Sequence, residues 1–175
     1  IPDSTLPTER DIYTELLFII TRLLADQDQA VLAYRYAQEI GYLLSPDASL
    51  FPGYTEVIAS SLLSLERYAE AEAFYSSLEE IEEFRLAALL GQVQALSDQD
   101  RFDDALAVLS EAEALIGTTT GILRQRGLLH FRAEDYENAA LAFDQWQDAV
   151  GTFGPAQAQP LFIAGISAYR LEDYD

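Results

Sequence analysis

A period of 34 residues runs through this chain and limits the folds that it can adopt. An aromatic residue recurs at this spacing, followed by alanine after three residues and by a larger apolar side chain after seven. The three sets are Tyr68, Ala71 and Tyr75; Phe102, Ala105 and Leu109; and Tyr136, Ala139 and Phe143. A fixed period of this length is typical of stacked supersecondary units, none of which buries its apolar face alone. The sequence therefore predicts a continuous repeat array rather than two separate globules.

Each repeated unit reads as two antiparallel helices joined by a short turn. A residue of modest size, Ala59, Val93 or Gly127, stands nine positions before each aromatic. A small residue there lets the two helices approach closely, and we expect the aromatic to fill the top of the gap. The alanine that follows is small for the same reason, because a larger side chain would overpack the helix crossing.

This pattern resembles the tetratricopeptide repeat family over about residues 53–175, and the unit around Gly127 matches the family motif fully. The resemblance implies an all-α, right-handed solenoid of stacked antiparallel helix pairs. The chain departs from the family where a proline often ends the second helix. Glu83, Gly117 and Gly151 stand at those places. The two glycines are equally good terminators through a left-handed C-cap.

The first helix pair is degenerate in this alignment, as a terminal capping unit usually is. Five apolar residues give its first helix a stripe at 3.6 spacing: Leu16, Ile19, Ile20, Leu23 and Leu24. A turn over residues 26–28 precedes a second helix over residues 30–44. Gln29 and Leu32 stand where the later units carry the aromatic and the alanine. Pro46 and Pro52 then break the chain around a predicted loop.

The predicted organisation follows from these boundaries. It comprises an N-terminal extension (1–9), a capping pair (10–51), three repeats (52–83, 84–117 and 118–151), and a loop with the first helix of a further repeat (152–175). An insertion over residues 151–160 lengthens the last step from 34 to 38 residues. We expect the last helix, about residues 158–171, to stack on the fourth pair. We also expect the chain to be a piece of a longer protein, with another repeat beyond Asp175.

Charge narrows the possible partners. Thirty acidic residues face ten basic ones, all arginine, for a formal charge of −20. Such a chain repels phosphate backbones and anionic lipid surfaces, so nucleic acid is not an expected partner. No apolar run reaches the ~18–20 residues that span a bilayer, so membrane insertion is not expected either. The acidic excess also suits a high-salt environment. Cysteine is absent, which is compatible with a cytoplasmic or a periplasmic location.

The residue inventory disfavours catalysis. His130 is the single histidine, so no second one can complete a metal-ligand set, and no cofactor motif is present. The acidic run over residues 79–83 reads as a solvated face rather than an acid–base pair. Gly117 to Gly121 resembles a phosphate loop only in composition, and Thr119 or Thr120 is expected to cap the next helix. The chain is therefore predicted not to be an enzyme.

In the tetratricopeptide family, ligands contact the first helix of each pair, which lines a concave groove. Carried over to this chain, the resemblance places three arginines and three aromatics on one side of that groove. They are Arg124, Phe131, Arg132, Phe162, Tyr169 and Arg170. Arginine beside aromatic faces suits extended peptides and carboxylates. The structural alternative is that Phe162 is core and that Arg124 and Arg132 pair with acidic neighbours such as Asp100 or Glu134.

The sequence thus predicts a non-catalytic scaffold that binds a protein, as a peptide or a partner helix, in the concave groove. The alternative is a structural assembly subunit that uses its convex face or the end of the stack. Self-association through the open C-terminal repeat belongs to this second hypothesis.

Overall fold

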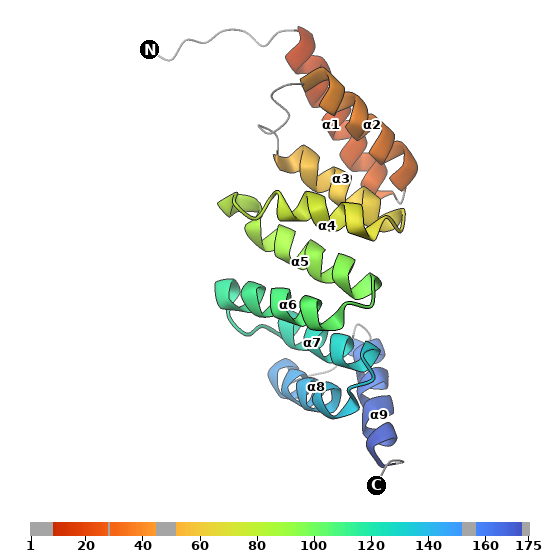
Figure 1. Ribbon diagram of the computed structural model, residues 1–175, viewed down its shortest axis with the longest axis vertical. Coiled ribbons are helices and arrows are strands. Elements are labelled where there is room, and N and C mark those ends of the chain that lie inside the picture. Colours follow the sequence, from red (N-terminus) through yellow and green to blue (C-terminus); the bar gives the residue numbers. More distant parts are fainter. Residues whose placement is uncertain (1–8, 28, 45–51, 152–156, 173–175) are drawn as a thin grey trace. The chain divides into compact units, whose positions relative to one another are not determined.

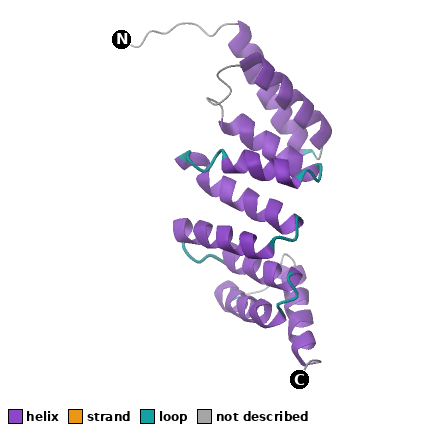
Figure 2. Cartoon of the chain, in the orientation of Figure 1, coloured by secondary structure: helices purple, strands orange, loops and turns teal. Residues whose placement is uncertain are grey.

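In the computed structural model, residues 9–27, 29–44, 52–151 and 157–172 are described, and they form helices joined by short turns, with no strand among them (Figure 1 and Figure 2). The helices are α1 Glu9–Asp26, α2 Ala30–Leu44, α3 Pro52–Ser64, α4 Tyr68–Ser76, α5 Glu82–Asp98, α6 Phe102–Ile116, α7 Thr120–Arg132, α8 Tyr136–Val150 and α9 Ala158–Glu172. The predicted N-terminal extension, the loop at residues 47–50 and the chain end at Tyr174 lie outside the described residues.

Two compact units, residues 1–91 and 92–175, divide the chain inside α5. In the first unit, α1 packs against α2, α2 against α3, and α3 against α4. In the second unit, α6 packs against α7, α7 against α8, and α9 against both α7 and α8. Each unit is built from consecutive antiparallel helix pairs, so the predicted all-α class is confirmed. The expected stacking of the last helix on the fourth pair is confirmed as well.

The core of the second unit forms where α7, α8 and α9 meet. Leu123, Phe143, Trp146 and Ala164 are buried together. A Cβ atom added to Gly127 would lie 2.9 Å from the Phe143 ring, so only glycine allows this approach. The expected small residue is thus confirmed, but the ring that covers it belongs to Phe143 and not to the aromatic at position 136. Apolar burial at this junction supplies most of its stability.

Tyr136 has a different role from the one expected. Its ring meets Phe131 edge-on, with centroids 5.9 Å apart, beside the turn between α7 and α8. The alanine expectation is confirmed, because Ala71, Ala105 and Ala139 are all fully buried.

A second glycine–aromatic contact joins α4 and α5 in the first unit. A Cβ atom at Gly91 would overlap the ring of Tyr75. Tyr75 is buried, and this burial raises the pKa of its hydroxyl to about 12. Gly91 is not part of the repeat pattern, since it lies two residues before Val93.

The turn inside each repeat has one recurrent backbone feature. Glu66, Asp100 and Glu134, again 34 residues apart, take left-handed φ angles of 58°, 57° and 60°. The next residue closes the turn by donating its N–H to a carbonyl five residues back, as from Arg67 to Leu62 (2.9 Å). This is the Schellman ending of a helix, here with acidic residues where glycine is usual.

The helix ends agree in part with the sequence analysis. Thr119 caps α7 by accepting the Ile122 N–H at 3.3 Å. Gly117 and Gly151 end α6 and α8 with positive φ angles of 77° and 72°, but their ψ angles of 175° and −56° are not those of the left-handed cap that was expected. Glu83 does not end a helix: α4 stops at Ser76, and Glu83 lies in the first turn of α5.

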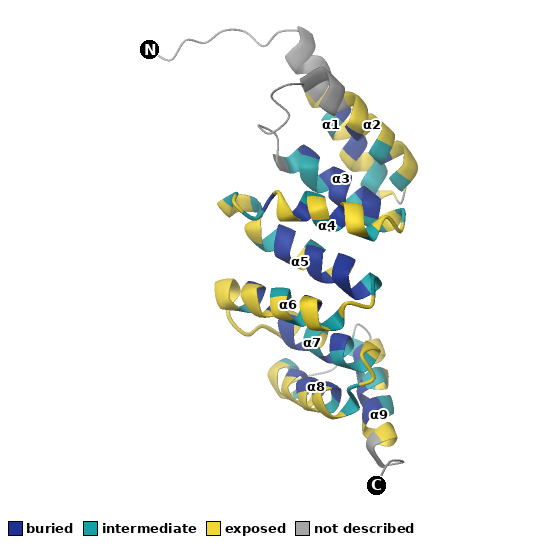
Figure 3. Ribbon diagram, viewed as in Figure 1, coloured by how far each residue is buried: buried dark blue, intermediate teal, exposed yellow. Residues whose placement is uncertain are grey.

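The N-terminal pair has the opposite apolar arrangement from the one that its stripe suggests. Four of the five stripe residues are exposed: Leu16 (53%), Ile19 (54%), Ile20 (44%) and Leu23 (54%). The buried side of α1 carries Leu17 and Thr21, whose hydroxyl donates to the Leu17 carbonyl at 2.7 Å. On α2, Val31, Leu32 and Tyr36 are also exposed. Figure 3 shows the many exposed positions along both helices.

Candidate functional site

The six residues predicted to bind a partner lie on two helices of the second unit. Arg124, Phe131 and Arg132 belong to α7, and Phe162, Tyr169 and Arg170 belong to α9. These helices pack against each other. The six side chains divide into a group that the protein itself engages and a group that is free to meet a ligand.

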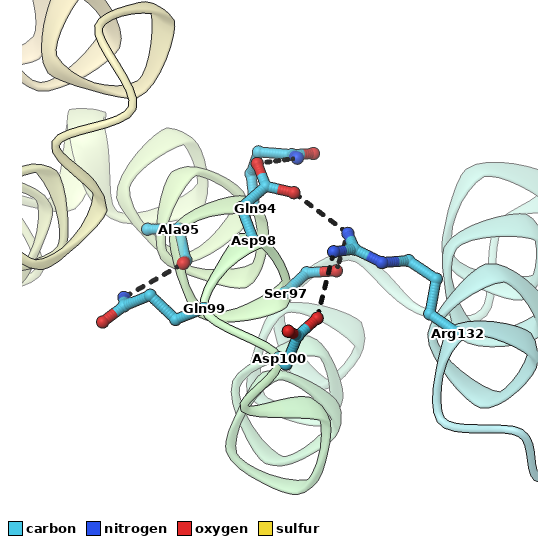
Figure 4. Close-up of polar contacts among 7 residues, drawn as sticks. All are labelled: Gln94, Ala95, Ser97, Asp98, Gln99, Asp100 and Arg132. Atoms are coloured by element: carbon cyan, nitrogen blue, oxygen red, sulfur yellow. Dashed lines mark hydrogen bonds and ion pairs between the residues drawn. The ribbon is translucent and has the colours of Figure 1, made fainter.

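Arg132 belongs to the engaged group (Figure 4). Its guanidinium donates to the Asp98 carboxylate at 2.9 Å and to the Ser97 hydroxyl at 2.7 Å, both near the end of α5. It lies 3.6 Å from the Asp100 carboxylate and 5.4 Å from the centre of the Phe102 ring. The alternative of pairing with acidic neighbours therefore describes Arg132. Its charge is compensated, and its geometry ties the ends of two first helices together.

Phe131 is also engaged. It is half-buried, and its ring is occupied by the edge-on contact with Tyr136. Such pairs add about 0.5–1.5 kcal/mol beyond burial. Phe131 therefore contributes mainly to the α7–α8 turn.

Arg124 is in the free group. It is exposed and makes no hydrogen bond or ion pair with any residue that the structure describes. It lines a pocket of about 280 Å³ with Thr120 and Gly121 of α7, Trp146 and Val150 of α8, and Gln157 and Pro160 beside and within α9. The pocket thus places one unpaired cation beside the side chains of Trp146, Val150 and Pro160.

The free residues of α9 form an exposed aromatic face. Phe162 is 69% exposed and Tyr169 is 62% exposed, the two highest values among the exposed large hydrophobic residues described. They are seven residues apart, so they lie on one side of the helix, two turns from each other. Arg170 is exposed and has no ion-pair partner among the described residues. The buried side of α9 contains Ala164 and Ser167 instead.

The exposed candidate residues on these two packed helices are Arg124 of α7 and Phe162, Tyr169 and Arg170 of α9, and we call this set the α7/α9 face. The other arginines of α7 are already paired, since Arg126 bonds Glu113 at 2.5 Å just as Arg132 bonds Asp98. An unpaired guanidinium binds carboxylates in bidentate fashion. The repeat pattern does not predict the pocket wall at Trp146 and Pro160, although the single tryptophan, three residues after Phe143, is a signal for it.

His130 has a structural partner. Its Nδ1 lies 3.0 Å from a carboxylate oxygen of Asp135, the N-cap residue of α8. Asp135 accepts hydrogen bonds from the side chain and backbone N–H of Asn138. These bonds from Asn138, and the nearby His130, hold the pKa of the Asp135 carboxyl below its ordinary value.

Other kinds of site find no support in the described parts of the chain. No group of three His, Cys, Asp or Glu residues there is arranged to hold a metal ion. None of the described helices is both long and apolar enough to cross a membrane. Three glutamates of the run at residues 79–83, Glu79, Glu80 and Glu82, line a small hollow with Arg85.

Comparison with known proteins places the fold. No family model and no curated protein matches the sequence. Among solved structures, MamA from Desulfovibrio magneticus RS-1, from residue 41 to its end, matches with a TM-score of 0.74. The match covers 95% of this chain and 88% of that chain at 17% sequence identity. The likeness shows a tetratricopeptide-like, all-α solenoid fold and, at this identity, only the fold.

Proposed function

We propose that this protein is a non-catalytic interaction module that binds a peptide or a partner helix on its α7/α9 face. The observation that carries the proposal is the exposure of Phe162 and Tyr169 on one side of α9. Large aromatics of this kind dominate the energetics of protein interfaces when a partner covers them. Scattered single apolar residues need no explanation, but two aromatics two turns apart on one helix form a continuous anchor.

The charges of this face support an acidic partner group. Arg124 and Arg170 are unpaired among the described residues, in a chain whose formal charge is −20. A positive site within a negative surface attracts a carboxylate locally while the rest of the molecule repels other anions. The preferred ligand is therefore a segment with two apolar side chains and at least one Asp, Glu or terminal carboxylate.

The scaffold supports binding through its rigidity. Phe162 and Tyr169 project from a helix whose opposite side is packed on α7 and α8 through Ala164 and Leu161. A receptor surface that is already ordered loses little conformational entropy on binding.

The proposal can be tested with short random peptides displayed on phage and selected on the wild-type protein. Enriched sequences should combine apolar residues with a carboxylate, and their synthetic forms give affinities by fluorescence anisotropy. Phe162→Ala/Tyr169→Ala and Arg124→Glu/Arg170→Glu should each weaken binding at least about tenfold without changing Tm, because all four side chains are exposed. Arg132 is left intact because its guanidinium is already bonded to Asp98 and Ser97.

The matched control for the charge reversal is Arg35→Glu/Arg85→Glu. These arginines are exposed, have no ion-pair partner among the described residues, and undergo the same change of charge. Binding should be unaffected in the control. Equal affinity of both charge-reversed proteins would refute a role for Arg124 and Arg170, and unchanged binding after loss of both aromatics would refute the face itself.

A further inference from the structure

The exposed stripe of α1 has a symmetric sequence. Its residues Leu16, Ile19, Ile20 and Leu23 read Leu-Ile-Ile-Leu in either direction, with spacings of three, one and three. These spacings place all four on one side of the helix, where each is 44–54% exposed. A monomeric protein rarely leaves such a row of β-branched and leucine side chains in water.

Two charges flank this stripe. Glu15 directly precedes the first leucine and Arg22 directly precedes the last, so both lie on the same edge of the stripe, seven residues apart. Both are exposed, and neither forms an ion pair with a described residue. The edge therefore carries opposite unpaired charges at its two ends.

We propose that the α1 stripe is the contact surface for a second copy of this chain, paired antiparallel about a two-fold axis between Ile19 and Ile20. This axis sets Leu16 of one copy beside Leu23 of the other and brings the isoleucines together at the centre. It also brings Glu15 to within two residues of Arg22 of the second copy, about 3 Å along the helix axis. Long side chains span that offset, and the contact forms twice by symmetry.

The charge pattern selects the antiparallel arrangement. In a parallel two-fold pair, the Glu15/Arg22 edges of the two helices would lie on opposite sides of the contact, so neither charge would face its opposite charge on the second copy. A two-fold contact is also closed, because both copies use the same patch and leave none open for a third. A second copy fits this surface better than an unrelated helix for two reasons. Its apolar residues have the same order when the helix is reversed, and its charges are opposite to those that they meet in the antiparallel pair.

This pairing uses α1 alone and is independent of the peptide-binding function proposed for the α7/α9 face. It differs as well from self-association through the C-terminal repeat, since no residue of α9 takes part. A contact of a few side chains per copy gives a weak dimer, with a Kd in the range of about 1–100 µM.

Sedimentation equilibrium over about 1–500 µM tests the pairing with the whole chain. Wild type should show a monomer–dimer equilibrium, and Ile19→Ser/Ile20→Ser should be monomeric throughout. Leu141→Ser is the matched control, because it removes another exposed apolar side chain, on α8, and should dimerise like wild type. Wild type that stays monomeric to the highest concentration, or a serine variant that dimerises normally, would overturn the proposal.

A charge swap tests the symmetry. Glu15→Arg should weaken dimerisation at least about tenfold, because it sets a second positive charge near Arg22 of the other copy. The same change makes the net charge less negative, from −20 to −18, so general charge repulsion predicts the opposite result. Glu15→Arg/Arg22→Glu restores opposite charges at −20 and should return the Kd to near the wild-type value. Tighter dimers from the single variant, or a double variant as weak as the single one, would contradict the arrangement.

Orientation can be read by cross-linking, since the chain has no cysteine of its own. A mixture of Glu15→Cys and Arg22→Cys proteins should form dimers with a short bis-maleimide, whereas each protein alone should not. Cross-linking of each variant with itself, without cross-linking in the mixture, would reject the antiparallel arrangement. The Arg124→Glu/Arg170→Glu protein should dimerise like wild type, so failure of one proposal does not affect the other.

Discussion

The helix pairs α1/α2 and α7/α8 use apolar residues in opposite ways. In α7/α8, Gly127 admits the Phe143 ring and the large side chains face inward. In α1/α2, the largest apolar row of α1 faces outward, and a threonine, Thr21, occupies the packed side. Both are antiparallel hairpins of similar length, so the difference lies in side-chain placement and not in topology.

The difference shows what the repeat signature does. A glycine or alanine facing a large ring fixes how the two helices of a pair cross, and the remaining apolar residues then have one inward direction. The first pair keeps only part of this signature: Ala33 is buried at the fourth position of α2, as Ala71 is in α4, but Ala30 begins the helix where the later pairs have an aromatic residue. The matching alanine is therefore Ala33 and not Leu32, one residue later than the sequence alignment placed it. Its crossing is set by Leu17, Ala33 and Ala37, all buried, which leaves the stripe free for another use.

The largest expected effect comes from removing the ring at the α7/α8 junction. Phe143→Ala should lower the free energy of unfolding by about 3–5 kcal/mol, because it leaves a cavity in a fully buried site. Ile19→Ala removes an exposed side chain from α1. At concentrations where the chain is monomeric, this variant should change the free energy of unfolding by less than about 0.5 kcal/mol. Urea unfolding of both variants gives the two values. A comparable loss from Ile19→Ala would show that the stripe is part of the core after all.

Two glycine substitutions test the same contrast with smaller expected changes in stability. Gly127→Ala forces a methyl group against Phe143 and should destabilise by about 1–3 kcal/mol. Gly165→Ala on α9 meets no described atom within 4 Å and should stabilise by about 0.5–1 kcal/mol through helix propensity. Thermal unfolding followed by circular dichroism separates the two signs. Equal shifts would mean that the close approach at Gly127 is not a constraint.

Two arginines of α7 provide a third test. A double-mutant cycle on Arg132 and Asp98 should give a coupling of about 0.5–1 kcal/mol, the size typical of a partly exposed pair. The matched cycle on Arg124 and Asp98 should give none, because Arg124 has no described partner. Denaturant titration of wild type and of the single and double variants supplies both couplings. Coupling in the second cycle only would reverse the division of the site into engaged and free residues.

The smallest effect concerns pH. The folded-state pKa of Asp135 lies below the ordinary 3.8, so its contribution is present above that value and is lost as pH falls through the folded pKa. Asp135→Asn keeps an N-cap acceptor but does not titrate. The stability advantage of wild type over this variant should therefore shrink from about pH 5 to about pH 3 in urea unfolding. An advantage that grows with acidification would show that the carboxyl is destabilised in the folded protein.

The sequence predicts the repeat pairs well because their anchors are local and periodic. Gly127, the buried alanines and the cap at Thr119 each follow from a residue type at a fixed spacing. Helix α2 begins at Ala30, as expected from the turn predicted at residues 26–28.

The site was less accessible to sequence reasoning. Periodicity places Arg124 and Arg132 on one helix face, but it cannot tell which of them meets a carboxylate. Arg132 reaches Asp98 because both stand near the ends of first helices, one repeat apart. The outward direction of the α1 stripe could not be predicted either. A periodic apolar pattern shows that the two sides of a helix differ, but it does not show which side packs against a neighbour.

The left-handed residues at positions 66, 100 and 134 have a consequence for the growth of such an array. Each turn is closed by bonds within its own few residues, and none of its backbone hydrogen bonds described here depends on the neighbouring pair. A gene segment encoding one period can therefore be duplicated or deleted between such turns with its joints intact. The number of repeats is free to drift over evolutionary time, while the glycine–ring contacts inside each pair stay under constraint.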